Sequence, residues 1–252
     1  MRLFIASLAL TTLTSASNVP TTNNLFANPN AEHKASWRIP TVHESAVQAR
    51  RILRLENIGT LSTVFPSTHS TENRPSEVGG MPIGLMDYYG DCEPSTGNPT
   101  ILAITIATSF RNVAAGSNIT LSLRWHAPYH RLYSAAAVPR FSLVGQLEDL
   151  SAEEVKDQNV AACFVKHHPD AAAWLPGNRI HESKWVRLVV KEIYWIGGFG
   201  DRAYIGWIPA EEWQSVTQEE IEKCRLPGEK SGWASWTSWF GFESDSQGIV
   251  EL

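Results

Sequence analysis

Histidine and carboxylate side chains are the residues in this sequence with the chemistry to hold a metal ion. Five histidines fall between positions 126 and 181, with Asp170 and Glu182 beside them: His126, His130, His167, His168 and His181. None of them forms the HExxH spacing that places two zinc ligands on one helical face. The adjacent His167 and His168 would diverge by about 100° on a helix and could not readily face one ion. Surface and capping roles explain these histidines better, and we predict no metal site.

A glycine-rich segment is the second pattern with a chemical meaning. Residues 198–203, GFGDRA, satisfy the relaxed GxGxxA pattern of dinucleotide-binding loops. That loop requires a helix directly after the glycines, so that the helix N-terminus meets a pyrophosphate. Here residues 203–209 have instead the pattern of a strand that ends in a proline. We therefore predict a hairpin in which Gly197–Asp201 reverses the chain, with glycines supplying positive φ angles.

The sequence patterns of nucleophilic catalysis do not occur in the chain. It has no GxSxG elbow, no Walker loop and no CxxC pair. Its carboxylates cluster at expected helix starts, for example at Glu153–Glu154 and Glu219–Glu220, where the helix dipole already accounts for them. The spacing of residues therefore predicts no catalytic group.

Three cysteines, Cys92, Cys163 and Cys224, allow one intramolecular disulfide and leave one thiol over. All three pairings are open from spacing alone. We favour Cys92 with Cys163 because Cys224 falls outside the expected barrel. The alternative treats Cys163 as a small buried apolar residue.

Strands and a few helices must position these side chains. A capping box at Thr41 and Glu44 starts a helix over residues 42–56, and a second at Ser151 starts one through about residue 166. Short helices are expected near residues 110–114, 169–175 and 217–224. Strand patterns cover residues 60–65, 81–89, 100–107, 118–125, 140–150, 185–196 and 203–208. Residues 66–80 between the first two strands should form a long exposed loop.

The strand over residues 118–125 shows most clearly what these strands build. Ile119, Leu121, Leu123 and Trp125 alternate with polar residues, which predicts one buried face and one wet face. Many short strands of this kind favour a closed or split antiparallel barrel. We therefore predict a mainly β protein with flanking helices, in the α+β class.

Composition and charge limit the function classes further. The chain has 252 residues, of which 43% are apolar and 19% charged, as in a globular protein of one domain. Its formal net charge is −5, and no window concentrates Lys or Arg. A nucleic-acid reader needs a basic face, so this class is excluded.

The N-terminus has the pattern of a secretory signal. Arg2 precedes an apolar run, Leu3–Leu13, and the small residues that follow indicate cleavage after residues 1–17. That run is about half the length needed to cross a bilayer, so no transmembrane span is expected. The sequon at Asn118 predicts N-glycosylation, because the signal would carry it into the secretory lumen.

Two segments flank the expected barrel. Residues 18–40 are rich in Asn, Thr and Pro and predict a flexible arm. Residues 227–252 form a Trp-rich tail that we expect to be flexible, in which aromatic residues recur every third position: Trp233, Trp236 and Trp239, with Phe240 and Phe242. The tail fits a membrane interface, a partner's groove, the protein's own barrel or disorder equally well.

Four motifs in order resemble one known family. They are Phe141–Leu147, His168–Ala171 (HPDA), Trp185–Trp195 and Gly197–Gly200 (GGFG). Together they resemble the CREG (cellular repressor) branch of the pyridoxamine 5'-phosphate oxidase-like superfamily. The resemblance covers about residues 46–216 and assigns residues 41–226 to one FMN-binding split-barrel-like domain. It implies a homodimer, with the flavin sites of enzymatic relatives at the dimer interface.

The resemblance also gives candidates for a flavin phosphate site. Thr108–Asn112 looks like the phosphate-binding stretch of flavin-binding relatives, which makes Ser109, Arg111 and Asn112 the candidate FMN ligands. Residues 81–89 carry no Lys or Arg to add a second cation, and Arg124 of the strand over residues 118–125 fits either face. Ser109 and Asn112 could equally cap a turn. We therefore expect that the protein binds no cofactor, and FMN is the alternative.

These observations lead to one expected function and two alternatives. We expect a secreted or vacuolar/endolysosomal CREG-like glycoprotein that is a non-catalytic binding or regulatory module, with a partner or ligand that the sequence does not identify. The alternatives are an FMN-dependent oxidoreductase and a haem-binding split-barrel protein.

Overall fold

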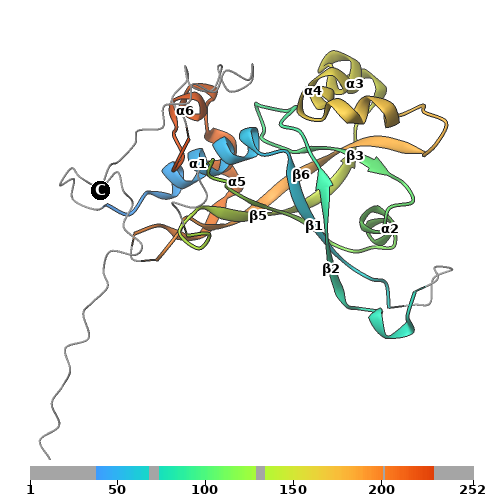
Figure 1. Ribbon diagram of the computed structural model, residues 1–252, viewed down its shortest axis with the longest axis horizontal. Helices are drawn as coiled ribbons and strands as arrows, with labels where there is room; N and C mark the ends of the chain where they lie inside the picture. Colours follow the sequence, from blue (N-terminus) through green and yellow to red (C-terminus); the bar gives the residue numbers. More distant parts are fainter. Residues whose placement is uncertain (1–37, 68–73, 129–133, 201, 230–252) are drawn as a thin grey trace, which may run out of the picture. The chain divides into compact units, whose positions relative to one another are not determined.

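A computed structural model describes residues 38–67, 74–128, 134–200 and 202–229. The expected signal peptide, most of residues 18–40 and of the Trp-rich tail, and His130 lie outside the described residues. One antiparallel sheet dominates the described part of the chain (Figure 1). This agrees with the predicted mainly β class with flanking helices.

The sheet has seven strands in the described residues. Their order is β2-β1-β4-β5-β6-β3, and β7 also pairs with β6. The bounds are β1 (Ile58–Val64), β2 (Pro82–Tyr88), β3 (Thr100–Ile104), β4 (Ile119–Arg124), β5 (Arg140–Asp149), β6 (Ser183–Ile196) and β7 (Ile205–Pro209). Each strand overlaps one predicted from the sequence.

Strand β6 is the longest of the described strands and pairs with three others. It pairs with β5 along one edge, and on its other edge residues 183–187 pair with β3 and residues 192–196 with β7. In the gap between them, Leu188 N donates to Pro99 O at 2.9 Å and Val190 N to Asn98 Oδ1 at 3.0 Å. The loop before β3 thus satisfies backbone groups that a strand would otherwise pair.

The two faces of the sheet differ in the way the alternation predicts. On β4, Ile119, Leu121 and Leu123 are buried, whereas Thr120 and Ser122 are half-buried and Arg124 is exposed. The buried face contributes to the main core, together with residues of β5 and β6. The opposite face, called the outer face below, carries the polar positions.

Helix α1 (Val42–Leu55) covers the buried face and packs against α5 (Ala210–Ser215) and α6 (Gln218–Lys223) (Figure 1). Its predicted capping box at Thr41 and Glu44 is present. Ala46, Ala49, Ile52 and Leu53 of α1 enter the core.

A buried arginine ties α1 to two other segments. Arg50 is fully buried and donates to the backbone oxygens of Trp213 at 3.0 Å and Pro94 at 2.5 Å. Burial lowers the pKa of Arg50, because a low-dielectric environment disfavours its charge. Gly97 has φ +71°, and a Cβ there would lie 2.6 Å from the guanidinium carbon, so this position requires glycine.

The helical segments differ from the sequence expectation at three places. The helix expected from Ser151 to residue 166 is two helices, α3 (Ala152–Asp157) and α4 (Val160–His167), because Asn159 adopts the left-handed conformation at φ 50°. Strand β3 ends at Ile104, three residues before the expected end, and α2 (Thr108–Ala114) follows. Helix α5 was not expected. The described residues also contain two 3-10 helices, Ser76–Val78 and Pro169–Trp174.

A disulfide joins Cys92, in the loop after β2, to Cys163 on α4. This is the pairing that the sequence analysis favours, and Cys224 is the remaining thiol. Around the bond lies a second core cluster made of Cys92, Leu102, Val160, Phe164, Ala171 and Trp185. The disulfide therefore attaches the helical excursion to the sheet.

Removing this bond should destabilise the fold. The cysteines are 71 residues apart, and closing a loop of this size restricts the unfolded chain. We expect the double variant Cys92→Ser/Cys163→Ser to lower the free energy of unfolding by about 2–4 kcal/mol in urea titrations. Cys224→Ser is the control and should change it by less than about 1 kcal/mol. Equal effects of the two variants would contradict this assignment.

His43 on α1 forms a second tie, to α5 and α6. Its Nδ1 lies 3.0 Å from Glu212 Oε2 and its Nε2 lies 2.9 Å from Glu220 Oε1. Hydrogen bonding to Glu220, and then to Glu212, raises the pKa of His43. The same contact, with the Thr217 cap, lowers the pKa of Glu220 to about 2.

This tie should make stability depend on pH. Because the pKa of His43 is raised in the folded state, its contribution is fully present below the ordinary value of about 6.5 and is lost as pH rises through the folded value. We expect His43→Gln to lower the urea midpoint at pH 5 and to have much less effect at pH 8.5. The exposed His181 provides a matched control, His181→Gln, which should have little effect at either pH.

Candidate functional site

The outer face of the sheet carries one continuous row of side chains. Strand registers place six residues side by side, one from each of six strands: Met86, Thr60, Ser122, Ser142, Tyr194 and Trp207. In the middle of the row, Ser122 Oγ and Ser142 Oγ are 2.7 Å apart. Towards one end, the rings of Tyr194 and Trp207 meet edge to face at 5.1 Å. The row combines hydroxyl groups with exposed apolar side chains.

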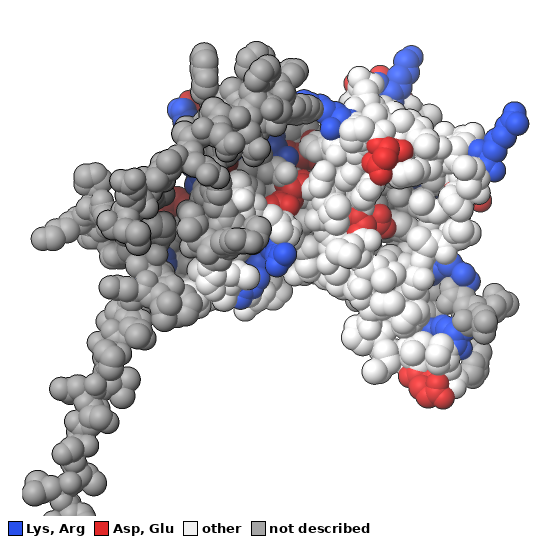
Figure 2. All heavy atoms as spheres, viewed as in Figure 1, with Lys and Arg blue, Asp and Glu red and all other residues white. Residues whose placement is uncertain are grey.

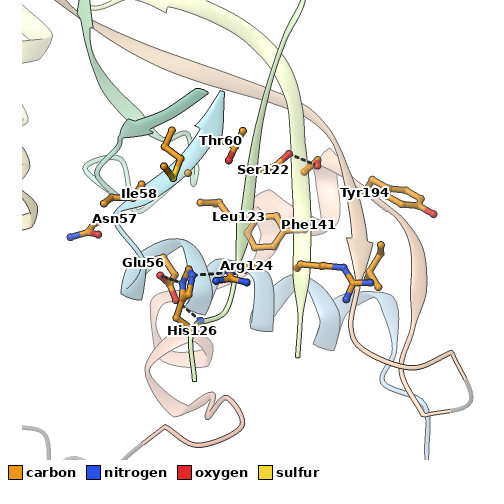
Figure 3. Close-up of a pocket in the computed structure, with 15 residues that line it drawn as sticks. Glu56, Asn57, Ile58, Thr60, Ser122, Leu123, Arg124, His126, Phe141 and Tyr194 are labelled. Atoms are coloured by element: carbon orange, nitrogen blue, oxygen red, sulfur yellow. Dashed lines mark hydrogen bonds and ion pairs between the residues drawn. The ribbon is translucent and has the colours of Figure 1, made fainter. Parts of the chain in front are cut away.

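A cavity of about 710 Å³ opens on this row (Figure 3). It extends to the neighbouring row of the outer face, which contains Arg124, Arg140 and Ile196. Cavities of this volume are typical of small-molecule sites. Its polar lining comes from the end of α1 and from β1, β4, β5 and β6: Glu56, Asn57, Thr60, Ser122, Arg124, His126, Arg140, Ser142 and Tyr194. Its apolar lining includes Ile58, Met86, Leu123, Phe141 and Ile196.

Glu56 anchors one end of the cavity. It is the C-terminal capping residue of α1, two residues before β1 begins, where the helix dipole disfavours a carboxylate. His126 compensates for this, because its backbone N–H donates to Glu56 Oε1 at 2.7 Å and its Nδ1 lies 2.8 Å from Oε2. The buried Trp125 holds this segment in place by donating from Nε1 to Pro227 O at 2.7 Å.

Arg124 completes a chain of three side chains. Its Nε donates to His126 Nε2 at 2.7 Å. Since an arginine N–H only donates, His126 Nε2 must accept, and the imidazole proton lies on Nδ1, where it is donated to Glu56. His126 is therefore neutral in this arrangement. Figure 3 shows Glu56, His126 and Arg124 joined in this order.

Arg140 lies directly opposite Arg124 in the β4–β5 register. Its Nη1 donates to Ala136 O at 3.3 Å. Among the described residues neither arginine forms an ion pair with a carboxylate. Two like charges on opposed strand positions destabilise a sheet unless an anion meets them.

The residues predicted for a flavin phosphate lie on α2 and do not line this cavity. Ser109 and Asn112 are buried, and Asn112 Nδ2 donates to Thr63 Oγ1 at 3.0 Å. Arg111 is exposed. The structure thus places these three residues on one short helix, but two of them face the protein interior.

The remaining predicted residues are dispersed. Asn118 is exposed directly before β4. His168 is buried, stacks on Tyr88 with ring centroids 3.9 Å apart, and its Nε2 lies 2.9 Å from Tyr89 O. In the part of the chain that the structure describes, no group of three or more His, Cys, Asp or Glu side chains could hold a metal ion.

Sequence reasoning missed two cavity residues, Glu56 and Arg140. It considered His126 only as a metal ligand and Arg124 only as a second cation for a flavin phosphate. Alternation along β4 carries a signal that Arg124 and His126 belong together, because they are two positions apart on the polar side. Glu56 and Arg140 reach the site only through the tertiary fold.

The chain matches one known protein family over most of its length. A model of the CREG β-barrel family matches residues 40–215. The chain belongs to this family. No curated protein sequence matches it.

Two solved structures are similar to the chain at low sequence identity. A heme-binding protein from Mycobacterium smegmatis is 21% identical with a TM-score of 0.53, over 71% of this chain and 62% of that one. The protein Atu2129 of unknown function, from Agrobacterium tumefaciens, is 22% identical with a TM-score of 0.49, over 71% of this chain and 64% of that one. The chain thus spans less than two thirds of the length of each of these two relatives. The predicted split-barrel fold, a curled antiparallel sheet with flanking helices, is confirmed.

The state of His126 gives a direct check of the site. We expect neutral His126 to carry its proton on Nδ1, because Arg124 donates to Nε2. Nitrogen-15 NMR of labelled histidine distinguishes the two tautomers. Arg124→Met removes the donor to Nε2 while Nδ1–H still donates to Glu56, so Nε2 can take up a second proton and more imidazolium should form. The control Arg179→Met, at an exposed position, should leave His126 unchanged. An Nε2-protonated His126 in the unaltered protein would contradict the described chain.

Proposed function

We propose that this CREG-family protein is a luminal binding module: a secreted or endolysosomal glycoprotein that forms a homodimer and performs no chemistry of its own. The observation that carries the proposal is the bonding of the cavity's reactive groups. Ser122 and Ser142 bond to each other, and the nitrogens of His126 engage Glu56 and Arg124. No hydroxyl in the cavity contacts a base that would activate it.

A flavin-dependent oxidoreductase is the first alternative, and the residues fit it poorly. A flavin phosphate carries nearly two negative charges and needs several donors. Ser109 and Asn112 are buried, and β2 (Pro82–Tyr88) contains no Lys or Arg. As they lie, the residues on α2 do not present a phosphate cradle.

Haem binding is the second alternative, motivated by the heme-binding relative from Mycobacterium smegmatis. An absorbance spectrum of the purified full-length secreted protein tests both alternatives together. We expect no flavin bands and no Soret band. Flavin released on denaturation would overturn the non-catalytic proposal. A Soret band at stoichiometric amount would show haem binding instead.

A nucleic-acid partner and a membrane span are not part of the proposal. The net charge is −5, and Lys and Arg are scattered over the face in view rather than gathered in one patch (Figure 2). None of the helices in the described ranges has the length and apolar character required to cross a membrane.

The proposed dimer uses the outer face of the sheet. Met86 is 80% exposed and Trp207 is 54% exposed, and they are the two ends of the row of six side chains described above. A two-fold axis through the middle of this row would bring Met86 of one copy against Trp207 of the other, so the exposed apolar ends of the row are complementary to each other.

Charge placed on this face should separate the copies. We expect a dimer for the unaltered protein in sedimentation velocity at micromolar concentration, and a monomer for Met86→Glu/Trp207→Glu, since two charges would be buried unpaired. Ile180→Glu is the control, because Ile180 is 74% exposed and precedes β6, outside the row. A monomeric unaltered protein would remove the dimer from the proposal.

The route through the secretory lumen has its own test. Expressed in eukaryotic cells with residues 1–17 included, the protein should appear in the medium or an acidic organelle with one glycan at Asn118. Asn118→Gln should abolish the mass change that endoglycosidase treatment produces. Protein that stays in the cytosol without a glycan would contradict this location.

A further inference from the structure

We propose that the cavity on the outer face binds an organic monocarboxylate, with the carboxylate between Arg124 and Arg140 and an apolar body along Ile58 and Met86. This inference rests on the proposed function as a binding module and names the ligand class of the same site. It is carried by the pairing of two arginines inside a cavity of about 710 Å³.

The opposed arginines keep several N–H groups that can donate to a ligand. Nε of Arg124 is bonded to His126, and both Nη atoms of Arg124 have no partner among the described residues. Nη1 of Arg140 contacts Ala136 O, which leaves its Nε and Nη2. An arginine whose Nε is occupied meets a carboxylate through its two Nη groups, in the bidentate geometry that guanidinium and carboxylate share.

The Glu56–His126 pair fixes the orientation of Arg124. Glu56 holds His126 by two hydrogen bonds, at 2.7 Å and 2.8 Å, and His126 in turn accepts from Arg124. The guanidinium is therefore oriented before a ligand arrives. Prior orientation of this kind reduces the entropy lost on binding.

The charges around the cavity favour a monoanion. Arg124 and Arg140 contribute two positive charges, Glu56 one negative charge, and His126 is neutral because Nε2 accepts from Arg124. The lining thus has a net charge of one positive unit. A carboxylate neutralises it, whereas a phosphate monoester, with nearly two negative charges, would leave an excess of negative charge beside Glu56.

The rest of the cavity suits an apolar ligand body. Ile58 and Met86 are 45% and 80% exposed, and Ile196 continues the apolar lining beyond Arg140. Thr60 and the Ser122–Ser142 pair lie between the apolar and cationic parts. Covering exposed apolar side chains would add about 25 cal/mol per Å² of buried area, so a longer aliphatic acid should bind more tightly than a short one.

Titration calorimetry with octanoate as the probe tests the proposal on the purified full-length secreted protein, at concentrations below micelle formation. We expect octanoate to bind at one site per chain, and acetate and the neutral octanol to bind at least about tenfold more weakly. Arg140→Gln should weaken octanoate binding by a similar factor. The matched control Arg179→Gln removes the same charge at an exposed position outside the cavity and should leave binding unchanged.

Three outcomes would overturn the inference: equal binding of octanol and octanoate, tighter binding of octyl phosphate than of octanoate, or equal effects of the two arginine variants. Thermal unfolding of each variant verifies that it folds. Sedimentation and absorbance of the same samples keep the two proposals apart. A colourless dimer that fails to bind octanoate overturns only the ligand class, whereas released flavin overturns the non-catalytic function whatever octanoate does.

Discussion

Burial of one face of the β-sheet is the constraint on which the rest of the structure depends. Fully burying a Leu or Ile side chain contributes about 1.5–3 kcal/mol, and β4 alone buries Ile119, Leu121 and Leu123. A slip of one residue would expose these side chains and bury Arg124. The register is therefore strongly fixed on the inner face. Because side chains alternate, the same register fixes which groups meet on the outer face.

Strand β6 and the loop before β3 hold the part of the sheet where β3 and β7 meet the same edge of β6. The loop continues the hydrogen bonding of β6 through Asn98 and Pro99 where β3 has ended and β7 has not begun. The same loop accepts from the buried Arg50 and is attached to α4 through Cys92. A segment without regular structure is thus held by a side-chain amide, a guanidinium and a disulfide, which compensate for the cost of ordering it.

The cavity follows from these restraints rather than from a separate catalytic loop. Its polar groups stand at the ends of rigid elements: Glu56 at the end of α1, His126 just past β4 and Arg140 at the start of β5. Each bonds to another protein group, yet the two arginines line the cavity and keep N–H groups that bond to no described residue. This arrangement of fixed donors supports the anion recognition that we propose.

The sequence by itself determined the strands, the capping boxes, the two-faced character of β4 and the family resemblance, because these depend on neighbouring residues and on their periodicity. It could not determine the site. Glu56 and His126 are 70 positions apart, and Arg124 meets Arg140 only through the β4–β5 register. It also could not tell that Ser109 and Asn112 turn inward, since the orientation of α2 depends on its packing against β1. Such contacts are decided by tertiary packing, in which burial of distant apolar residues determines which polar groups become neighbours.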